Sequence, residues 1–231
     1  MLGLPDGTRV CLFDLDGVLT QTASVHAAAW KQMFDDYLHT RDEPFHEFTQ
    51  DDYEEYVDGK PREDGVRSFL ASRGIELSAK TVTELSSTKN DLVLRLIREQ
   101  GVQVYDGSVR YVKAARDAGL RRAVVSSSAN TKEVLRVTGM EDLFEAVIDG
   151  VVAEREGLKG KPAPDTFLAG AKALGVEPAG AAVFEDALAG VEAGKAGGFG
   201  FVVGVDRVGH ADDLRAHGAD IVVADLSELF E

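Results

Sequence analysis

From about residue 102 onward, short apolar runs rich in β-branched residues alternate with amphipathic, alanine-rich stretches. This alternation is typical of a parallel sheet covered by helices. With a first run near the N-terminus, the expected strands are 9–13, 122–125, 146–148, 181–184, 201–205 and 221–223. The expected helices are 108–118, 131–138, 165–174 and 187–196, with the left-handed C-cap of each placed at Gly119, Gly139, Gly175 and Gly197 in turn.

The segment from about residue 22 to 97 has a different pattern, with no convincing strand. Its acidic, helix-favouring stretches are 23–39, 62–73 and 87–100. We therefore expect an α/β fold: a doubly wound, mostly parallel sheet with a Rossmann-like core and a helical cap, or lid, inserted after the first strand. The expected domains are a catalytic core of residues 1–21 plus 98–231 and a cap of residues 22–97. Hinges are expected near 21–23 and 98–101, and a ligand at the carboxyl ends of the strands.

The charge and the single cysteine narrow the classes of function. With 40 acidic and 25 basic side chains, the formal net charge of −15 opposes binding to nucleic acid and to anionic membranes. The N-terminus lacks a signal-peptide pattern, and no apolar run is long enough to span a bilayer. One cysteine, Cys11, excludes an intrachain disulfide and suits a reducing compartment. We expect a cytoplasmic protein with no nucleic-acid or membrane partner.

Two aspartates stand where the first strand ends, in the stretch FDLDG at residues 13–17. Residues i and i+2 of a strand project to one side, so Asp14 and Asp16 are expected to face the ligand side together. Close carboxylates repel unless a cation is near, which favours a metal. A calcium loop is excluded, because Val18 and Leu19 stand where an oxygen ligand and a glycine are needed. An Asp-Gly turn with incidental acids is the structural alternative.

A serine cluster follows the second expected strand, in the stretch VVSSSAN at residues 124–130. Ser126, neighbouring backbone N–H groups and the start of the next helix could together hold a phosphate. A serine cluster that only caps a helix is the simpler interpretation of this stretch alone.

A lysine held between prolines lies in the stretch GLKGKPAPDTF at residues 157–167. Pro162 and Pro164 stiffen the chain around Lys161, whose ammonium could neutralise a phosphoryl oxygen. A solvated surface lysine is the more common meaning of such a residue. Lys159, two positions earlier, serves as the comparison for that case.

A second acid pair, Glu185 and Asp186, follows another apolar strand and precedes a helix. Acids at a helix N-terminus are favourable on dipole grounds alone. The joint pattern is more informative, since the two acid pairs, the serine and the lysine all fall at carboxyl ends of core strands or in the loops beyond, where a doubly wound sheet brings them together.

These four stretches resemble the four motifs of the haloacid dehalogenase superfamily of phosphotransferases, over nearly the whole chain. The resemblance implies that Asp14 attacks phosphorus to form an aspartyl-phosphate and that Asp16 is the general acid and base. It implies that Ser126 and Lys161 hold the transferring phosphoryl group. It also implies Mg²⁺ as cofactor, held by Asp14, the backbone carbonyl of Asp16, and Asp186, with Glu185 assisting.

The insertion is similar to that of the β-phosphoglucomutase branch of this superfamily. The matching stretches are FDLDGVLTQTASVHAAAWK at 13–31, GKPRED at 59–64 and the pair Lys89-Asn90. The resemblance implies substrate contacts from Thr22, His26, Trp30, Arg62, Lys89, Ser127, Ser128 and Asn130. Helix packing is the alternative for His26 and Trp30, which lie four apart on one helix face, and a solvated helix-start arginine is the alternative for Arg62.

The chain departs from that branch at three positions. Ala129 stands in place of a lysine near the distal phosphate, Gly65 in place of a serine, and Gln21 in place of an aspartate. The leading hypothesis is a mutase that interconverts β-glucose 1-phosphate, or a related sugar 1-phosphate, and the 6-phosphate through a bisphosphate. A phosphatase of small phosphorylated metabolites is the alternative. A phosphoacceptor signalling domain is the third, disfavoured by chain length and by the helical insertion. We expect a monomer acting on a small phosphorylated sugar.

Overall fold

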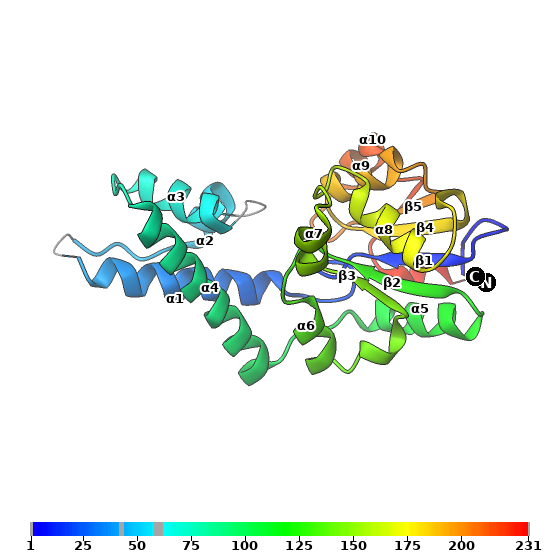
Figure 1. The fold of residues 1–231 in the computed structure, drawn as a ribbon, viewed down its shortest axis with the longest axis horizontal. Helices are drawn as coiled ribbons and strands as arrows, with labels where there is room; N and C mark the ends of the chain where they lie inside the picture. The colour runs from blue at the N-terminus through cyan, green and yellow to red at the C-terminus, as the bar shows by residue number, and fades with distance from the viewer. Residues whose placement is uncertain (1, 42–43, 58–61, 231) are drawn as a thin grey trace. The chain divides into compact units, whose positions relative to one another are not determined.

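The computed structural model describes residues 2–41, 44–57 and 62–230. The chain divides into two compact units (Figure 1): unit 1 comprises Met1–Thr22 and Val102–Glu231, and unit 2 comprises Ala23–Gly101. The chain therefore returns to unit 1 at Val102, later than the expected position 98, because the last helix of unit 2 continues to Gln100.

Unit 1 is built on a six-stranded sheet with the order β3-β2-β1-β4-β5-β6, in which every pair of neighbouring strands is parallel. The strands are β1 (Val10–Phe13), β2 (Arg121–Val125), β3 (Ala146–Ile148), β4 (Ala181–Glu185), β5 (Phe201–Val205) and β6 (Ile221–Val223). The strand order reverses between β1 and β4, so the carboxyl end of β1 lies at the topological switch point of the sheet. This doubly wound sheet confirms the predicted fold class.

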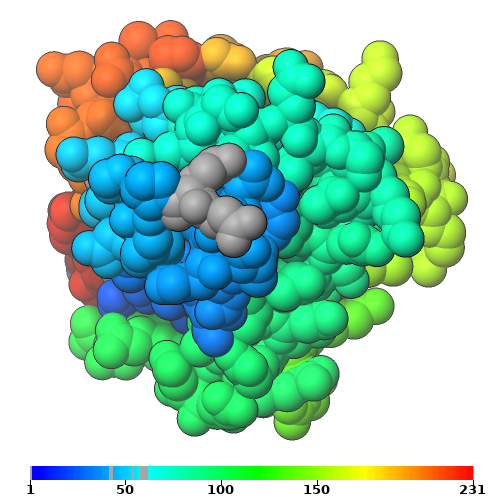
Figure 2. Space-filling model, turned by 90° about the vertical axis from the view of Figure 1, so that its left-hand side faces the viewer, coloured from blue at the N-terminus to red at the C-terminus, as the bar shows by residue number. Residues whose placement is uncertain are grey.

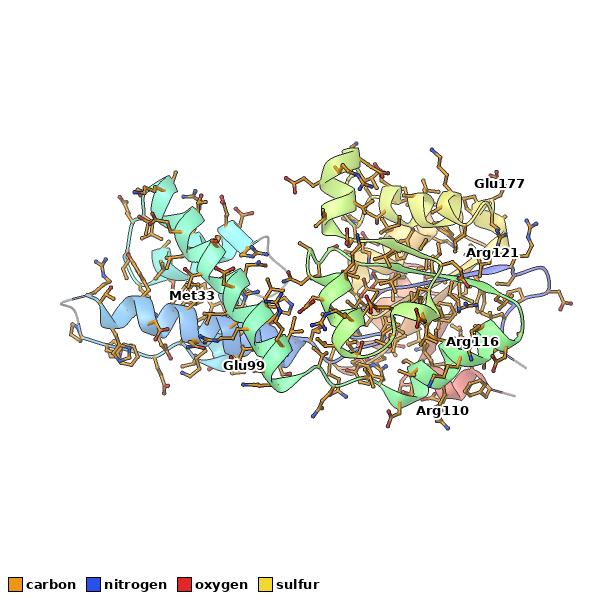
Figure 3. All side chains as sticks on the ribbon, turned by 60° about the horizontal axis from the view of Figure 1, so that its bottom comes forward. Met33, Glu99, Arg110, Arg116, Arg121 and Glu177 are labelled. Atoms are coloured by element: carbon orange, nitrogen blue, oxygen red, sulfur yellow. The ribbon has the colours of Figure 1, made fainter. Side chains whose placement is uncertain are left out.

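Helices cover both faces of this sheet (Figure 1). The helices of unit 1 are α5 (Asp106–Asp117), α6 (Thr131–Val137), α7 (Gly150–Glu156), α8 (Asp165–Ala173), α9 (Leu188–Ala196) and α10 (Ala211–His217). Short 3₁₀ turns are η2 (Glu141–Leu143), η3 (Pro178–Gly180) and η4 (Leu226–Leu229). Right-handed crossovers put α5 and α6 on one face and α8, α9 and α10 on the other. Arg110 and Arg116 lie on the outer side of α5, away from the sheet (Figure 3).

The two faces of the central strand β1 pack against different cores. Leu12 joins the hydrophobic cluster between the sheet and α8 and α9, and it is fully buried. Phe13, on the opposite face, stacks on Phe184 of β4 with ring centroids 4.4 Å apart and meets the ring edge of Tyr111 from α5. Cys11, also fully buried in β1, has its thiol pKa raised to about 12 by burial. Burial on both faces fixes the strand that carries the first acid pair.

Three of the four predicted left-handed caps are present, at Gly119, Gly139 and Gly175. The prediction for Gly197 is wrong: its φ is −76°, and the left-handed residue after α9 is Gly198, with φ 68°. A Cβ at position 197 would meet the ring of Phe199 and the side chain of Pro164, so close packing explains this glycine.

The regular elements of unit 2 are all helical among its described residues. Its elements are α1 (Ala23–His39), α2 (Gln50–Asp52), the π-turn η1 (Tyr53–Val57), α3 (Arg62–Ser72) and α4 (Ala79–Gln100). Helices α1 and α4 pack side by side, as the blue and the turquoise-to-green residues of Figure 2 show. Buried Met33 of α1 lies among these helices (Figure 3). Helix α4 begins eight residues before the predicted position 87, because Ser78 caps it by accepting the N–H of Thr81 at 3.1 Å.

Aromatic rings form the centre of unit 2. Phe34 of α1 is fully buried and contacts three rings: Trp30 at 5.2 Å, Phe48 at 5.1 Å and Phe69 of α3 at 4.3 Å between centroids. Such ring pairs add to the free energy gained by burying apolar area. One side chain of α1 therefore holds the segment before α2 and helix α3 together.

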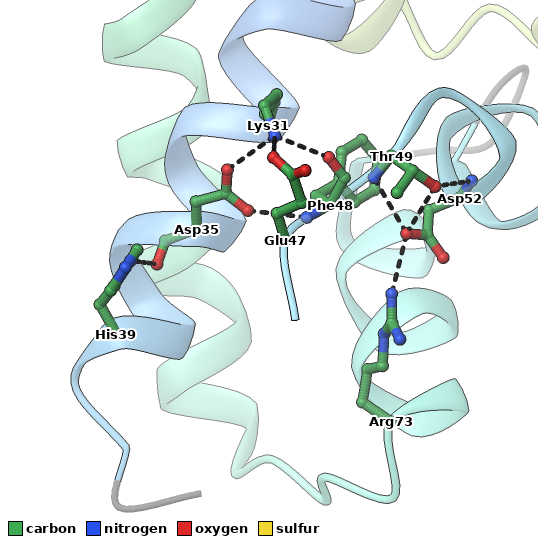
Figure 4. Close-up of polar contacts among 8 residues, drawn as sticks. All are labelled: Lys31, Asp35, His39, Glu47, Phe48, Thr49, Asp52 and Arg73. Atoms are coloured by element: carbon green, nitrogen blue, oxygen red, sulfur yellow. Dashed lines mark hydrogen bonds and ion pairs between the residues drawn. The ribbon is translucent and has the colours of Figure 1, made fainter. Parts of the chain in front are cut away.

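Polar contacts at the surface of unit 2 fasten the segment that follows α1 (Figure 4). Lys31 pairs with Asp35 at 3.0 Å and Glu47 at 2.7 Å, and it donates to the carbonyl of Phe48 at 2.9 Å. Asp35 in turn accepts the N–H of Phe48 at 2.7 Å. These bonds hold Phe48 where it reaches the aromatic centre.

The sequence pattern did not predict α7, α10, or the α2 and η1 turns. These elements are short, so too few residues carry an apolar period. Among the described residues, no helix is both long and apolar enough to cross a membrane.

We predict that Phe34→Ala lowers the free energy of unfolding of unit 2 by about 3–5 kcal/mol, because the cavity adjoins three rings. The single tryptophan, Trp30, reports the urea-unfolding transition of this unit by fluorescence. Phe45→Ala is the matched control, since Phe45 is 41% exposed. It should cost about 1 kcal/mol or less. Equal losses in the two variants would contradict the assignment of Phe34 as the centre of the core.

Candidate active site

The sheet register brings the first acid pair beside the second. Phe13, the last residue of β1, aligns with Val124 of β2 and Phe184 of β4. The N–H of Asp14 donates to the carbonyl of Phe184 at 2.9 Å. Asp14 and Glu185 therefore leave neighbouring strands at the same level, and Ser126 follows β2 on the other side.

Lys161 lies between these carboxylates. Its ammonium is 2.5 Å from Asp14 Oδ1 and 2.5 Å from Glu185 Oε1, and it donates to the carbonyl of Val125 at 3.1 Å. The Lys161 side chain is 10% exposed and packs over the ring of Phe167 at 4.8 Å. Lys159, the comparison residue, is exposed. The two lysines of one loop thus occupy opposite environments.

Asp14 and Asp16 both lie beyond the strand, because β1 ends at Phe13, so the expected strand alternation does not extend to them. The intervening Leu15 is fully buried, and Asp16 is half-buried. Its Oδ1 accepts a short hydrogen bond from the hydroxyl of Thr22. The two aspartates therefore have different partners, an ammonium for Asp14 and a hydroxyl for Asp16.

Gly17 allows the loop of the first acid pair to lie against that of the second. Its φ is 80°, in the left-handed region, and a Cβ on Gly17 would overlap the carboxylate of Asp186. Both the backbone conformation and the close approach require glycine here. Any side chain at this position would displace Asp186 or the loop itself.

The electrostatics of the cluster follow from burial and crowding. Burial raises the pKa of Asp14 well above its ordinary value; Lys161 opposes the shift and the other carboxylates add to it. Burial and the neighbouring Glu185 raise the pKa of Asp186 to about 8. Burial alone would lower the pKa of Lys161, but Asp14 and Glu185 outweigh it, and the pKa lies above the ordinary value. The ammonium is charged at neutral pH, yet it does not offset the whole carboxylate cluster.

Three carboxylates fit a divalent cation. Asp14, Glu185 and Asp186 each offer an oxygen, and these oxygens lie within 4.8 Å of one another. Carboxylate oxygens are the ligands that Mg²⁺ prefers in proteins. Glu185 uses Oε1 for Lys161 and Oε2 for the N–H of Ala187 at 3.0 Å, which fixes its orientation. The carboxylate of Asp16 does not belong to this group.

The serine loop is folded on itself. Ser126 is buried, and its hydroxyl accepts the N–H of Ser128 at 3.1 Å, while Ser128 accepts the N–H of Asn130 at 3.1 Å. The N–H of Ser126 donates to the carbonyl of Ile148 at 2.9 Å. Ser127 is exposed. These three N–H groups are therefore already used within the structure, so they are not the donors that the loop offers to a ligand.

Unit 2 gathers three of the predicted substrate residues. Lys89 of α4 is 5% exposed; its ammonium donates to Nδ1 of His26 at 2.8 Å and lies 4.9 Å from the ring centroid of Trp30. Burial, followed by the nearby cations Lys89 and Arg62, lowers the pKa of His26 to about 3. The imidazole is therefore neutral and accepts from Lys89. Trp30 also packs on Phe34, so it has the structural role considered for it.

Arg62 begins α3 and reaches across to α4. It donates to Asn90 Oδ1 at 3.0 Å and to the carbonyl of Ser86 at 3.4 Å. A simple solvated arginine is excluded, because the guanidinium is half-buried and hydrogen-bonded. Positions 59–61 of the GKPRED stretch lie outside the described residues. Gly65 packs against Trp30, where a Cβ would come within 3.2 Å of the indole.

Comparisons with known proteins identify the family. Residues 8–198 match the family model of haloacid dehalogenase-like hydrolases. The chain belongs to the haloacid dehalogenase superfamily. It is an enzyme of the phosphotransferase and phosphatase class, similar to the β-phosphoglucomutases. A β-phosphoglucomutase of Mycobacterium bovis is 54% identical, over 99% of this chain and 94% of its own length. That of Bacillus subtilis is 34% identical, over 96% and 91%.

A solved structure agrees with this assignment. The crystal structure of β-phosphoglucomutase from Clostridium difficile has a TM-score of 0.75 and 26% identity, covering 96% of this chain and 93% of that chain. The motif resemblance that was stated from the sequence is thereby confirmed at the level of the superfamily.

The loop at 206–210 bonds to the backbone of both acidic loops and was not predicted from the sequence. Arg207 donates to the carbonyl of Gly17 at 2.8 Å, and His210 donates to the carbonyl of Asp186 at 3.2 Å. The stretch DRVGH has the composition of an ordinary turn. Only the folded structure, which brings this loop next to Gly17, identifies it.

We predict that the imidazole of His26 stays neutral from pH 8 to pH 5, as followed by NMR of the ring carbons. Lys89→Met should raise the pKa of His26 toward its ordinary value of 6.5, because one of its neighbouring cations is lost. Titration of His26 near pH 6.5 in the unmodified protein would contradict the buried pair. Since the folded pKa lies below the unfolded one, the contribution of His26 to stability is complete above pH 6.5 and is lost as the pH falls toward 3.

Proposed function

We propose that this protein is a magnesium-dependent phosphotransferase that works through an aspartyl-phosphate on Asp14. The proposed reaction interconverts β-glucose 1-phosphate, or a related sugar 1-phosphate, and the 6-phosphate through a bisphosphate. The observation that supports it is the buried ammonium of Lys161 bound to both Asp14 and Glu185, at the switch point of the sheet. The names of the relatives from M. bovis and B. subtilis support the choice of substrate.

In the proposed reaction, Asp14 is the nucleophile. One carboxylate oxygen attacks phosphorus and the bond to the leaving oxygen breaks, which divides one difficult transfer into two easier ones. Lys161 holds Asp14 through Oδ1 and offers positive charge to the phosphoryl oxygens. The hydroxyl of Ser126, at the end of β2, holds another phosphoryl oxygen.

Asp16 is the proposed general acid and base. It would donate a proton to the leaving oxygen and remove one from the attacking hydroxyl in the return step. The hydrogen bond from Thr22 orients the carboxylate while no substrate hydroxyl is bound. A hydroxyl donor such as Thr22 leaves the carboxylate of Asp16 able to exchange its contact for one to a substrate hydroxyl, as proton transfer requires.

The donor set fits Mg²⁺, with Asp14 and Asp186 as direct carboxylate ligands, the backbone carbonyl of Asp16 as a further ligand, and Glu185 assisting. When bound, the cation would screen the repulsion between the carboxylates and an incoming phosphate. Lys161 and Mg²⁺ would then share the charge of the cluster, which the lysine alone does not offset.

We propose further substrate contacts from the sugar- and phosphate-binding residues predicted on the chain. In unit 1 these are Thr22, Ser127, Ser128 and Asn130. In unit 2 they are His26, Trp30, Arg62 and Lys89. We also propose that the protein is a cytoplasmic monomer that acts on a small sugar phosphate and binds neither nucleic acid nor membranes.

The product distribution tests the function. With Mg²⁺, β-glucose 1-phosphate and a trace of the bisphosphate, we predict glucose 6-phosphate in large excess over free phosphate, measured separately. Asp14→Asn should form neither product. Free phosphate without isomerisation would establish the phosphatase alternative instead, which the absence of a lysine at Ala129 makes the main competitor. Full turnover by Asp14→Asn would reject Asp14 as the nucleophile.

The two lysines of the loop before α8 provide a matched pair. Lys161→Met should lower kcat by about 10²–10³, because it removes a charge aimed at the phosphoryl group. Lys159→Met carries the same change two residues away and should leave kcat unchanged, since that side chain is exposed. Similar kinetics for both variants would show that the buried ammonium has no part in the transfer.

A further inference from the structure

One loop of unit 1 bonds to the backbone of both acidic loops. It follows β5 and comprises residues 206–210, which we call the anchor loop. Arg207 Nε donates to the carbonyl of Gly17 at 2.8 Å, immediately after Asp16 in the chain. His210 Nε2 donates to the carbonyl of Asp186 at 3.2 Å. Both contacts are to main-chain oxygens, so they fix the course of the acidic loops without occupying their carboxylates.

The guanidinium of Arg207 is itself held from several sides. Its side chain is 15% exposed and lies over the ring of Tyr105, with Cζ 3.5 Å from the centroid. Nη1 donates to the carbonyl of Ala224 at 2.6 Å, and the carboxylate of Asp225 is 3.6 Å away. The planar fork of arginine can make these bonds together, and a lysine cannot. The bond to Gly17 therefore starts from a fixed point.

The anchor loop is also ordered internally. A single oxygen of Asp206, Oδ1, accepts the N–H groups of Val208 at 3.2 Å, Gly209 at 2.7 Å and His210 at 3.0 Å. The N–H of Asp206 donates to the carbonyl of Val223 in β6 at 2.8 Å. Arg207 and His210 are thus carried by a loop tied to the sheet.

The segment that Arg207 holds is where the chain leaves and re-enters unit 1. The N–H of Gly17 donates to the carbonyl of Thr20 at 2.8 Å, and the N–H of Tyr105 donates to the carbonyl of Leu19 at 3.0 Å. Thr20 also forms an antiparallel bridge with Val104. Arg207 contacts the outgoing segment at Gly17 and the returning segment at Tyr105, and thereby joins both to the end of the sheet.

We propose that Arg207 is a positioning residue that sets the place of Asp14 and Asp16, and that His210 does the same for Asp186. This inference rests on the proposed function, since it assigns those acids to the transfer. A displacement of reacting groups by about 1 Å can cost up to about 10²-fold in rate. Without the bond to Gly17, the loop of the first acid pair keeps its hydrogen bonds to Thr20 and Tyr105 but loses the link through Arg207 to the anchor loop and β6.

Kinetics with a matched control test the role of Arg207. Arg207→Gln should lower kcat about tenfold and change KM less than about twofold, because the residue touches the loop and not the substrate. Arg207→Lys should recover only part of the loss. Arg215→Gln removes the same charge from an exposed position of α10 and should leave both constants unchanged. The rate is measured for whichever product the unmodified enzyme forms, glucose 6-phosphate or free phosphate.

Hydrogen exchange supplies a readout that does not depend on turnover. In Arg207→Gln, amides of the peptide 15–22 should exchange faster, and in His210→Phe those of 184–190, with no change in either peptide for Arg215→Gln. Unchanged exchange in both peptides would overturn the anchor role, and a rise in KM alone would make Arg207 a substrate contact instead. An inactive unmodified enzyme would refute the proposed function, while the exchange comparison would still decide whether the anchor loop holds the acidic loops.

Discussion

The ion triad of Asp14, Lys161 and Glu185 is the interaction on which the rest of the structure depends. Three strands and the loop before α8 meet at it, because Asp14 directly follows β1, Glu185 ends β4, and β2 offers the carbonyl of Val125 to the same ammonium. Isolated buried charges are costly, so each of these groups needs the others to be placed correctly. The sheet register provides that placement, since the strands leave their ladders at one level.

Different hydrogen-bond partners distinguish the carboxyl groups of this site from one another. Asp14 is held by an ammonium, Glu185 by an ammonium and a backbone N–H, and Asp16 by a hydroxyl. Carboxyl groups of the same kind therefore differ in their properties, because their hydrogen-bond partners differ. The contrast between an Asp14 bound to an ammonium and an Asp16 bound to a hydroxyl agrees with the proposal that one acid attacks and the other moves protons.

Much of this architecture could be predicted from the sequence. The alternation of apolar runs gave all six strands within one residue at either end, because buried parallel strands are short continuous apolar runs. The strand ends then located Asp14, Ser126 and Glu185. The anchor loop could not be found this way, since Arg207 bonds to a residue 190 positions earlier and has no periodic pattern around it. Helix α4 was predicted too short, because its first turns depend on a serine cap rather than on apolar spacing.

The buried thiol of Cys11 has a practical consequence for studying such a molecule. It is the only cysteine of the chain, it is fully enclosed in β1, and its raised pKa keeps it protonated. Thiolates, not thiols, react with maleimides and mild oxidants, so the native chain is unreactive toward both while folded. A cysteine introduced at any exposed position would then carry a fluorophore or spin label alone, without removal of the native residue from the central strand.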